Sequence, residues 1–187
     1  MGAFENAVAI WENLPRTNTD EIINADEFYD MHIMPLVADK FLKKYCGKTA
    51  KYKTMFLTLG TSWQPLALSI LLHSPERVIF LATEDVSESS KKIIKFVNKK
   101  NISYKVCIVD KGNSGRLLQA VKNETALLED KKAVCIDKPG GTKARAAAAA
   151  MMAVYFNWDI FYIENDFLPV LRKPEPGTEK VIKMEKP

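Results

Sequence analysis

The sequence predicts an α/β protein in which a doubly wound, mainly parallel sheet carries helices on both faces. From residue 53 onward, short apolar runs alternate with amphipathic stretches, an order that builds parallel strands through right-handed helical crossovers. The apolar runs lack the in/out alternation of half-exposed strands, which is typical of strands buried on both faces. The expected strands are residues 54–59, 78–83, 104–109, 133–137 and 160–164, and the expected helices are residues 63–73, 87–100, 114–129 and 142–156.

A helical N-terminal extension over residues 1–50 precedes this pattern. Residues 3–13 and about 19–46 are expected to be helices, and the second opens with acids in its first turn and closes with lysines and a glycine. Pro35 predicts a kink in the second helix or its break into two helices. Apolar residues at helical spacing along it predict a stripe packed in a core rather than a cofactor site.

The C-terminal residues predict a β-hairpin. Residues 168–171 and 180–184 are expected to be its edge strands, and the turn is expected at residues 174–177, where two prolines exclude a helix. We therefore assign residues 51–187 to one domain, and we expect this domain to be a module of a longer protein.

Composition limits the partners and the compartment. With 187 residues, 47% hydrophobic and 27% charged, the chain is long enough for one well-cored domain. The net charge of +4 suits an anionic small ligand but falls short of the basic surface that duplex nucleic acid requires. Three cysteines without a CxxC motif indicate a reducing compartment, and no signal peptide or membrane-spanning run is evident. We therefore expect a soluble cytoplasmic protein without a membrane partner.

The strongest candidate site is the loop after the fourth expected strand, because ligands of open parallel sheets bind beyond the carboxyl ends of the strands. Gly140 and Gly141 let the backbone approach an anion closely, and Thr142 can cap the following helix and donate to a phosphate. Lys143 supplies a mobile positive charge. The spacing matches neither a Walker A loop nor GxGxxG, and an ordinary strand-to-helix turn would also suit these residues.

The loop after the first expected strand is the second candidate. Gly60, Thr61 and Ser62 place a flexible backbone and two hydroxyls at a helix N-terminus, which suits a phosphate or a ribose. Trp63 can stack on a base or pack in the core, and the two alternatives stay open. Weaker candidates for contacts to ribose or base edges follow the second and third strands: Thr83, Glu84 and Asn113.

Familiar enzyme chemistry has little support in the sequence. His32 and His73 have no Cys, His or carboxylate partner at ligand spacing, so we expect no metal site. His73 falls near the end of an expected helix, where a cation would complement the helix dipole. No GxSxG, HExxH or recognisable carboxylate pair is present, and we expect no cofactor.

Four segments of the chain, in this order, resemble the CARF domain, the CRISPR-associated Rossmann fold. FLTLGTSWQPL at residues 56–66 is similar to the first CARF signature, and residues 74–84 are similar to the segment that follows it. DKPGGTKA at residues 137–144 resembles the second signature, usually written D-x-T-G-G-T-K, and residues 172–179 resemble the segment that closes many such domains. The resemblance runs from about residue 53 to the end of the chain.

The resemblance implies a Rossmann-like sensor domain that acts as a homodimer. Such a domain binds cyclic tetra- or hexaadenylate across the dimer interface and switches on an attached effector in type III CRISPR antiviral defence. No sequence resembling an effector is present in this chain. The residues expected to contact the ligand are Gly60, Thr61, Ser62, Trp63, Thr83, Glu84, Asn113, Gly140, Gly141, Thr142 and Lys143.

One departure from the family pattern bears on catalysis. Pro139 stands where the family has threonine, so one hydroxyl and one backbone donor are absent, which argues against ring cleavage more than against binding. The enzymatic alternative is a metal-independent ring nuclease, in which Lys143 stabilises charge and Ser62 or Thr61 orients the reacting groups. A third alternative is an ordinary mononucleotide-binding domain.

Overall fold

The structure is a computed structural model that describes residues 2–60, 62–82, 88–109, 114–128, 134–137 and 143–185. Among these, only the backbone is described for residues 88, 89, 114, 134–137 and 143–146. The chain divides into two compact units. One comprises Met1–Cys46 and Glu164–Lys180, and we call it the helical unit; the other comprises Gly47–Ile163 and Val181–Pro187, and we call it the sheet unit.

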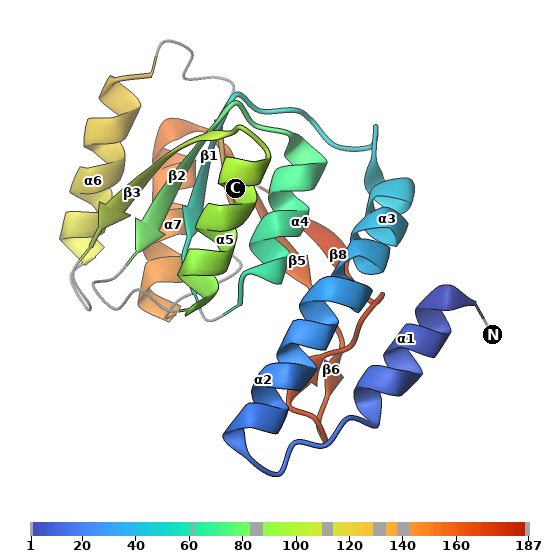
Figure 1. The fold of residues 1–187 in the computed structure, drawn as a ribbon. Helices are drawn as coiled ribbons and strands as arrows, with labels where there is room; N and C mark the ends of the chain where they lie inside the picture. The colour runs from blue at the N-terminus through green and yellow to red at the C-terminus, as the bar shows by residue number, and fades with distance from the viewer. Residues whose placement is uncertain are drawn as a thin grey trace. The chain divides into compact units, whose positions relative to one another are not determined.

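The sheet unit is a doubly wound α/β fold, as the sequence predicted. Its strands lie in the order β3-β2-β1-β4-β5-β8 (Figure 1). Strand β1 pairs in parallel with both β2 and β4, and parallel pairs also join β2 to β3 and β4 to β5. The strands are β1 (Thr54–Thr58), β2 (Arg77–Ala82), β3 (Ser103–Ile108), β4 (Val134–Asp137), β5 (Asp159–Glu164) and β8 (Lys180–Met184).

Helices connect these strands at the predicted places. Figure 1 shows α4 and α5 in front of the sheet and α7 behind it. Both faces of the central strand are therefore covered, and the consecutive residues Met55, Phe56 and Leu57 are all completely buried. The helices of the sheet unit are α4 (Gln64–His73), α5 (Glu88–Lys99), α6 (Ser114–Ala126) and α7 (Lys143–Phe156).

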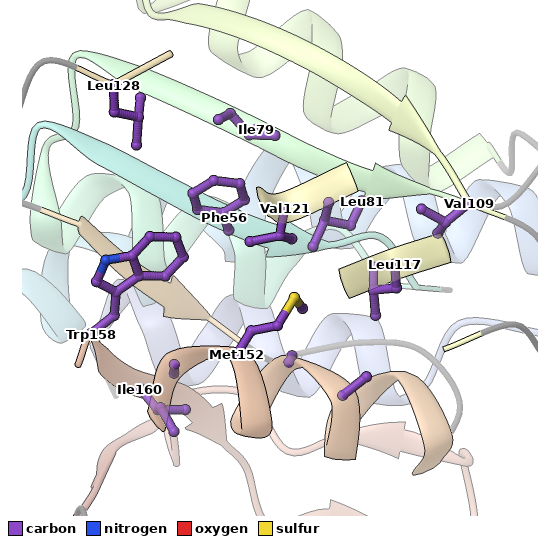
Figure 2. Packing of buried hydrophobic residues seen from close by; sticks show 13 residues of the cluster. Phe56, Ile79, Leu81, Val109, Leu117, Val121, Leu128, Met152, Trp158 and Ile160 are labelled. Atoms are coloured by element: carbon purple, nitrogen blue, oxygen red, sulfur yellow. The ribbon is translucent and has the colours of Figure 1, made fainter. Parts of the chain in front are cut away.

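The core of the sheet unit contains a stack of three aromatic rings. The ring centroid of Trp158 lies 5.0 Å from that of Phe56 on β1 and 4.7 Å from that of Phe156 on α7. Figure 2 shows Trp158 and Phe56 in the cluster, with Met152 pointing from α7 toward the strands. Val121 of α6 belongs to the same buried cluster, so α6 and α7 share one apolar core with the strands.

The helical unit contains the N-terminal helices. These are α1 (Ala3–Glu12), α2 (Thr19–Phe28), the π-helical segment η1 (Tyr29–Ile33) and α3 (Met34–Tyr45). Near Pro35, where the sequence predicted a kink or a break, the hydrogen-bonding pattern changes while the backbone stays helical: η1 ends immediately before α3, and the proline lies in the first turn of α3. Proline is tolerated there because the first-turn N–H groups have no partner within the helix. Asn18 caps α2, its side chain accepting a hydrogen bond of 2.9 Å from the backbone N–H of Glu21.

A C-terminal hairpin is present, but the prediction paired the wrong strands. β6 (Phe167–Leu168) pairs antiparallel with β7 (Lys173–Pro174), whereas Lys180–Met184 joins the main sheet as β8. Pro174 thus lies in a two-residue edge strand rather than in a turn, which is compatible with its missing N–H. Met184 packs against the buried cluster of the sheet unit, a contact that an isolated hairpin would not supply.

The segment Glu164–Lys180 belongs to the helical unit through specific contacts. Gly177 has φ +86° and lies so close to Phe4 that a Cβ atom would stand 2.8 Å from the ring. The Lys173 Nζ lies 2.7 Å from a carboxylate oxygen of Asp26. The division of the chain into an extension over residues 1–50 and a domain over 51–187 stays a prediction.

Candidate ligand-binding edge of the sheet

The carboxyl ends of four parallel strands meet at one edge of the sheet. Thr58 of β1 is aligned with Leu81 of β2, and Ala82 of β2 with Ile108 of β3. On the other side of β1, Leu57 is aligned with Asp137 at the end of β4. The loops that follow these strands therefore start side by side.

The strand order places the two candidate loops at the topological switch point. From β1 the chain proceeds outward to β2 and β3, whereas β4 and β5 lie on the other side of β1. The loops after β1 and β4 consequently leave the sheet next to each other. In doubly wound sheets this is the position where ligands bind. Sequence patterns and strand order thus select the same two loops independently.

The N-termini of two helices follow these loops. α4 begins at Gln64 and α7 begins at Lys143, and neither helix has an acidic residue in its first turn. The N-terminus of a helix carries positive partial charge and unpaired N–H groups, so it favours an anion. The sheet unit as a whole also has 20 Lys and Arg against 11 Asp and Glu, a net charge of +9. This edge is therefore electrostatically suited to phosphate.

Three of the candidate residues after β1 lie in the described part of the chain. Gly60, Ser62 and Trp63 are half-buried just before α4, and Trp63 is the N-cap residue. The ring centroid of Trp63 lies 6.1 Å from that of Phe96 on α5. This contact agrees with the packing alternative for Trp63, and stacking on a base stays a prediction.

The remaining candidates lie outside the described residues, except for the backbone of Lys143, the first residue of α7. Their roles therefore stay predictions. The residues outside the described ranges are Thr61, Thr83, Glu84, Asn113, Gly140, Gly141 and Thr142.

The loop after β5, which contains Asn165 and Asp166, forms hydrogen bonds with a later segment of the chain. The backbone N–H of Asp166 donates to the hydroxyl of Thr178 over 3.0 Å, and the amide of Asn165 donates to Glu179 Oε1 over 3.2 Å. Burial raises the pKa of Glu179, while the backbone N–H of Gly177 donates to the same carboxylate oxygen. This loop holds residues 175–180, a role that its sequence did not indicate.

His73 is the last residue of α4, at the end of a helix as the sequence predicted. Its side chain is completely buried, and burial lowers its pKa from the ordinary value of 6.5, so the ring does not supply the cation that would complement the helix dipole. Nδ1 lies 2.9 Å from the carbonyl oxygen of Ala50, which identifies Nδ1 as the protonated nitrogen of a neutral ring. The ring packs against Tyr52 and Phe161, and the Tyr52 hydroxyl donates to Asp159. His73 is thus a structural residue of the core.

Two further observations concern the described residues alone. They contain no group of three or more His, Cys, Asp or Glu side chains that could hold a metal ion. None of their helices is both long enough and apolar enough to cross a bilayer.

Comparison with known proteins identifies the family. No protein-family model matches the chain. Over 133 residues, however, the chain is 31% identical to the CRISPR system endoribonuclease Csm6 of Thermus thermophilus, an alignment that covers 66% of this chain and 27% of that protein. This relative is a CRISPR system protein, which agrees with the CRISPR association that the resemblance of the signature segments implied. The chain carries a CARF domain.

Two solved structures have the same fold as this CARF domain. Can2 from Sulfobacillus thermosulfidooxidans, in complex with cyclic tetra-adenylate, superposes with a TM-score of 0.53 at 18% identity, over 59% of this chain and 32% of Can2. Protein VC1899 from Vibrio cholerae superposes with a TM-score of 0.52 at 18% identity, over 62% of this chain and 30% of that protein. The chain spans about a quarter of Csm6 and less than a third of the chains of both structures.

Proposed function

We propose that this CARF domain is a sensor that binds a cyclic oligoadenylate, tetra- or hexaadenylate, and switches on an attached effector in type III CRISPR antiviral defence. The observation that carries the proposal is the position of the two signature loops. They flank the switch point at the carboxyl edge of a sheet unit with a net charge of +9. Can2, which shares the fold, was solved with cyclic tetra-adenylate bound.

The two loops would contact different parts of the ligand. Gly140 and Gly141 would let backbone N–H groups approach the phosphates, with Thr142 and Lys143 adding a hydroxyl donor and a positive charge. Backbone and hydroxyl groups of the β1 loop would contact ribose or phosphate on the other side of the switch point. The adenines would enter side pockets whose expected residues are Trp63, Thr83, Glu84 and Asn113.

The proposed sensor is a homodimer. A ring of identical nucleotides has rotational symmetry, and a twofold dimer can present the same loops to both halves of it. Binding can drive an effector only if the ligand prefers one arrangement of the two protomers over another. We expect this sensor in the cytoplasm, without duplex nucleic acid or membrane as a partner.

Calorimetry with cyclic tetra- and hexaadenylate tests the proposal. The wild-type chain is expected to bind at least one ring at micromolar concentration, and Lys143→Ala is expected to weaken binding about tenfold or more because a charge-assisted phosphate contact is lost. Lys99→Ala, in the last turn of α5, removes the same charge elsewhere and should leave the affinity unchanged. Absence of binding by both rings would contradict the proposal.

Incubation of the ring with the protein separates sensing from the ring-nuclease alternative. A pure sensor leaves the ring intact after prolonged incubation. A metal-independent nuclease would instead produce linear products that carry a 2′,3′-cyclic phosphate, and Lys143→Ala would abolish them. Pro139 in place of threonine leads us to expect an intact ring.

A further inference from the structure

Residues 89–109 carry most of the net positive charge of the sheet unit. They include six lysines and no aspartate or glutamate, so they supply +6 of the net +9 of the whole unit. This segment comprises most of α5 and all of β3. On many exposed helices, acids and bases four residues apart stabilise each other. Because the segment has no acid, its charge must be complemented from elsewhere.

The lysines of α5 form a stripe along its exposed side. Lys91, Lys95 and Lys99 are all exposed, and their spacing of four residues places them on one side of the helix. Ile93 and Val97, on the opposite side, are completely buried. Successive lysines of the stripe are about 6 Å apart along the helix axis. Like charges at this spacing destabilise a helix, whereas a row of phosphates along the stripe would neutralise them.

The chain neutralises one lysine of this segment and leaves the end of the stripe without a counter-charge. Lys105 of β3 faces α6, where its Nζ lies 2.5 Å from a carboxylate oxygen of the buried Glu124. Among the described residues, by contrast, Lys95 and Lys99 form no ion pair. An anion from outside the chain can therefore contact both of these lysines without displacing an internal partner.

An exposed aromatic ring lies on the same face of the sheet as α5. Tyr104 of β3 is 37% exposed, and its ring packs edge to face on Phe80 of β2, with 6.2 Å between the centroids. Ile79 and Leu81, the neighbours of Phe80, belong to the cluster that packs on α6 and α7. Because side chains alternate along a strand, Phe80 and Tyr104 face the layer of α4 and α5, which lies in front of the sheet in Figure 1.

The stripe leads away from the candidate ligand edge and toward Tyr104. α5 follows the carboxyl end of β2 and ends just before the amino end of β3, so it runs back along the sheet. Lys99 lies about 12 Å further along the helix axis than Lys91. Only residues 100–102 separate α5 from β3, which places Tyr104 near the end of the stripe and remote from the two signature loops.

We propose that the lysine stripe of α5 (Lys91, Lys95 and Lys99) and Tyr104 bind a single-stranded nucleic acid. The lysines contact successive phosphates, and an unpaired base stacks on the exposed ring of Tyr104. Residues 89–109 contain no arginine, the side chain whose planar fork makes paired hydrogen bonds with base edges. The surface therefore suits an unpaired strand with little sequence preference. This function is separate from ring sensing and does not depend on it.

Fluorescence anisotropy of a labelled oligouridylate of about 12 nucleotides, titrated with the full chain, tests the phosphate contacts. The double variant Lys95→Ala/Lys99→Ala should weaken binding about tenfold or more at low salt. The slope of log affinity against log salt concentration should become shallower by about 1.4, because each lost phosphate contact on a single strand contributes about 0.7. Lys122→Ala/Lys183→Ala removes the same charge from α6 and from β8, at the far edge of the sheet, and should leave binding unchanged.

Two replacements of Tyr104 test the stacking contact. Tyr104→Leu keeps an apolar side chain against Phe80 but removes the ring, and it should weaken binding about fivefold or more with an unchanged salt slope. Tyr104→Phe retains the ring and should bind as the wild type does. Equal affinities of the leucine and phenylalanine variants would overturn the stacking contact.

Competitors and ring binding distinguish this surface from the alternatives. Absence of oligouridylate binding by the wild type at low salt overturns the proposal, and so does an unchanged affinity of Lys95→Ala/Lys99→Ala. Tighter binding of a duplex or of polyglutamate would assign the stripe to another class of partner and also overturn it. Oligouridylate that stays bound in saturating cyclic tetraadenylate supports a separate site, whereas its displacement contradicts one. Failure of both rings to bind in calorimetry contradicts the proposed function alone.

Discussion

The two compact units of this chain are built in opposite ways. In the sheet unit, strands alternate with helices, and strand pairs such as β1–β2 and β2–β3 join elements that follow one another along the chain. In the helical unit, contacts such as Lys173–Asp26 and Gly177–Phe4 join segments from opposite ends of the chain. Periodicity in the sequence therefore predicts the sheet unit, and it cannot predict which distant segment completes the helical unit.

The sheet unit and the helical unit also differ in net charge. The sheet unit carries a net charge of +9, whereas the helical unit has 7 Lys and Arg against 12 Asp and Glu, a net charge of −5. The whole-chain value of +4 conceals this asymmetry. An anionic ligand is attracted to one unit only, which is the unit that carries both signature loops.

The largest effect is expected in the core of the sheet unit. Trp158→Ala should lower the free energy of unfolding by about 3–5 kcal/mol, because it leaves a cavity between Phe56 and Phe156. Urea unfolding measures this loss. Hydrogen exchange should show faster exchange of amides in the sheet unit than the counterpart Trp11→Ala produces there, since Trp11 is buried in the helical unit. A loss below about 1 kcal/mol would show that this stack is not central to the core.

A smaller effect is expected where the two ends of the chain meet. Gly177→Ala should cost about 1–3 kcal/mol, because alanine is strained at φ +86° and its Cβ would collide with Phe4. Gly47→Ala is the matched control, since Gly47 has φ +78° and nothing within 4 Å of the added Cβ. Thermal unfolding of both variants separates steric cost from backbone strain. Equal losses would mean that Phe4 moves aside freely.

Acid should weaken the sheet unit through His73. Because burial lowers the pKa of His73 below 6.5, the unfolded chain binds a proton that the folded chain does not. Stability is therefore complete above pH 6.5 and falls as the pH decreases below it, by at most about 1.4 kcal/mol per pH unit from this residue. Urea unfolding of the wild type and His73→Phe from pH 8 to pH 5 measures the difference. Parallel curves would contradict the prediction.

The smallest effect is expected for the ion pair within the helical unit. Lys173 and Asp26 are both partly exposed, so Lys173→Ala should cost only about 0.5 kcal/mol. The loss should shrink in 1 M salt, where exposed charges are screened. Lys43→Ala, which removes the more exposed pair with Asp39, provides the comparison. A loss above about 2 kcal/mol would assign this long-range pair a larger structural role than partial exposure allows.

The places of the candidate loops in the order of strands and helices could be predicted from the sequence, because the loops follow strands with a clear apolar signal. Gly60 follows β1 and Lys143 begins α7, as the pattern predicted, whereas the contacts of these residues with a ligand stay predictions. The burial of His73 and the strand partners of the hairpin could not be predicted correctly. His73 is enclosed by contacts with Ala50 and Phe161, and β8 lies beside β5 in the main sheet. The residues next to His73 and β8 in the sequence do not indicate these contacts.

By itself, the sequence determined the class of fold, the order of strands and helices in the sheet unit, and the two signature loops. These features follow from local periodicity and from glycines and prolines, which act within a few residues. Only the tertiary structure decided that β1 lies between β2 and β4, that residues 164–180 complete the helical unit, and that Tyr104 lies on the same face of the sheet as α5. Those features depend on which distant segments pack together, and the energy of packing is absent from any short stretch of sequence.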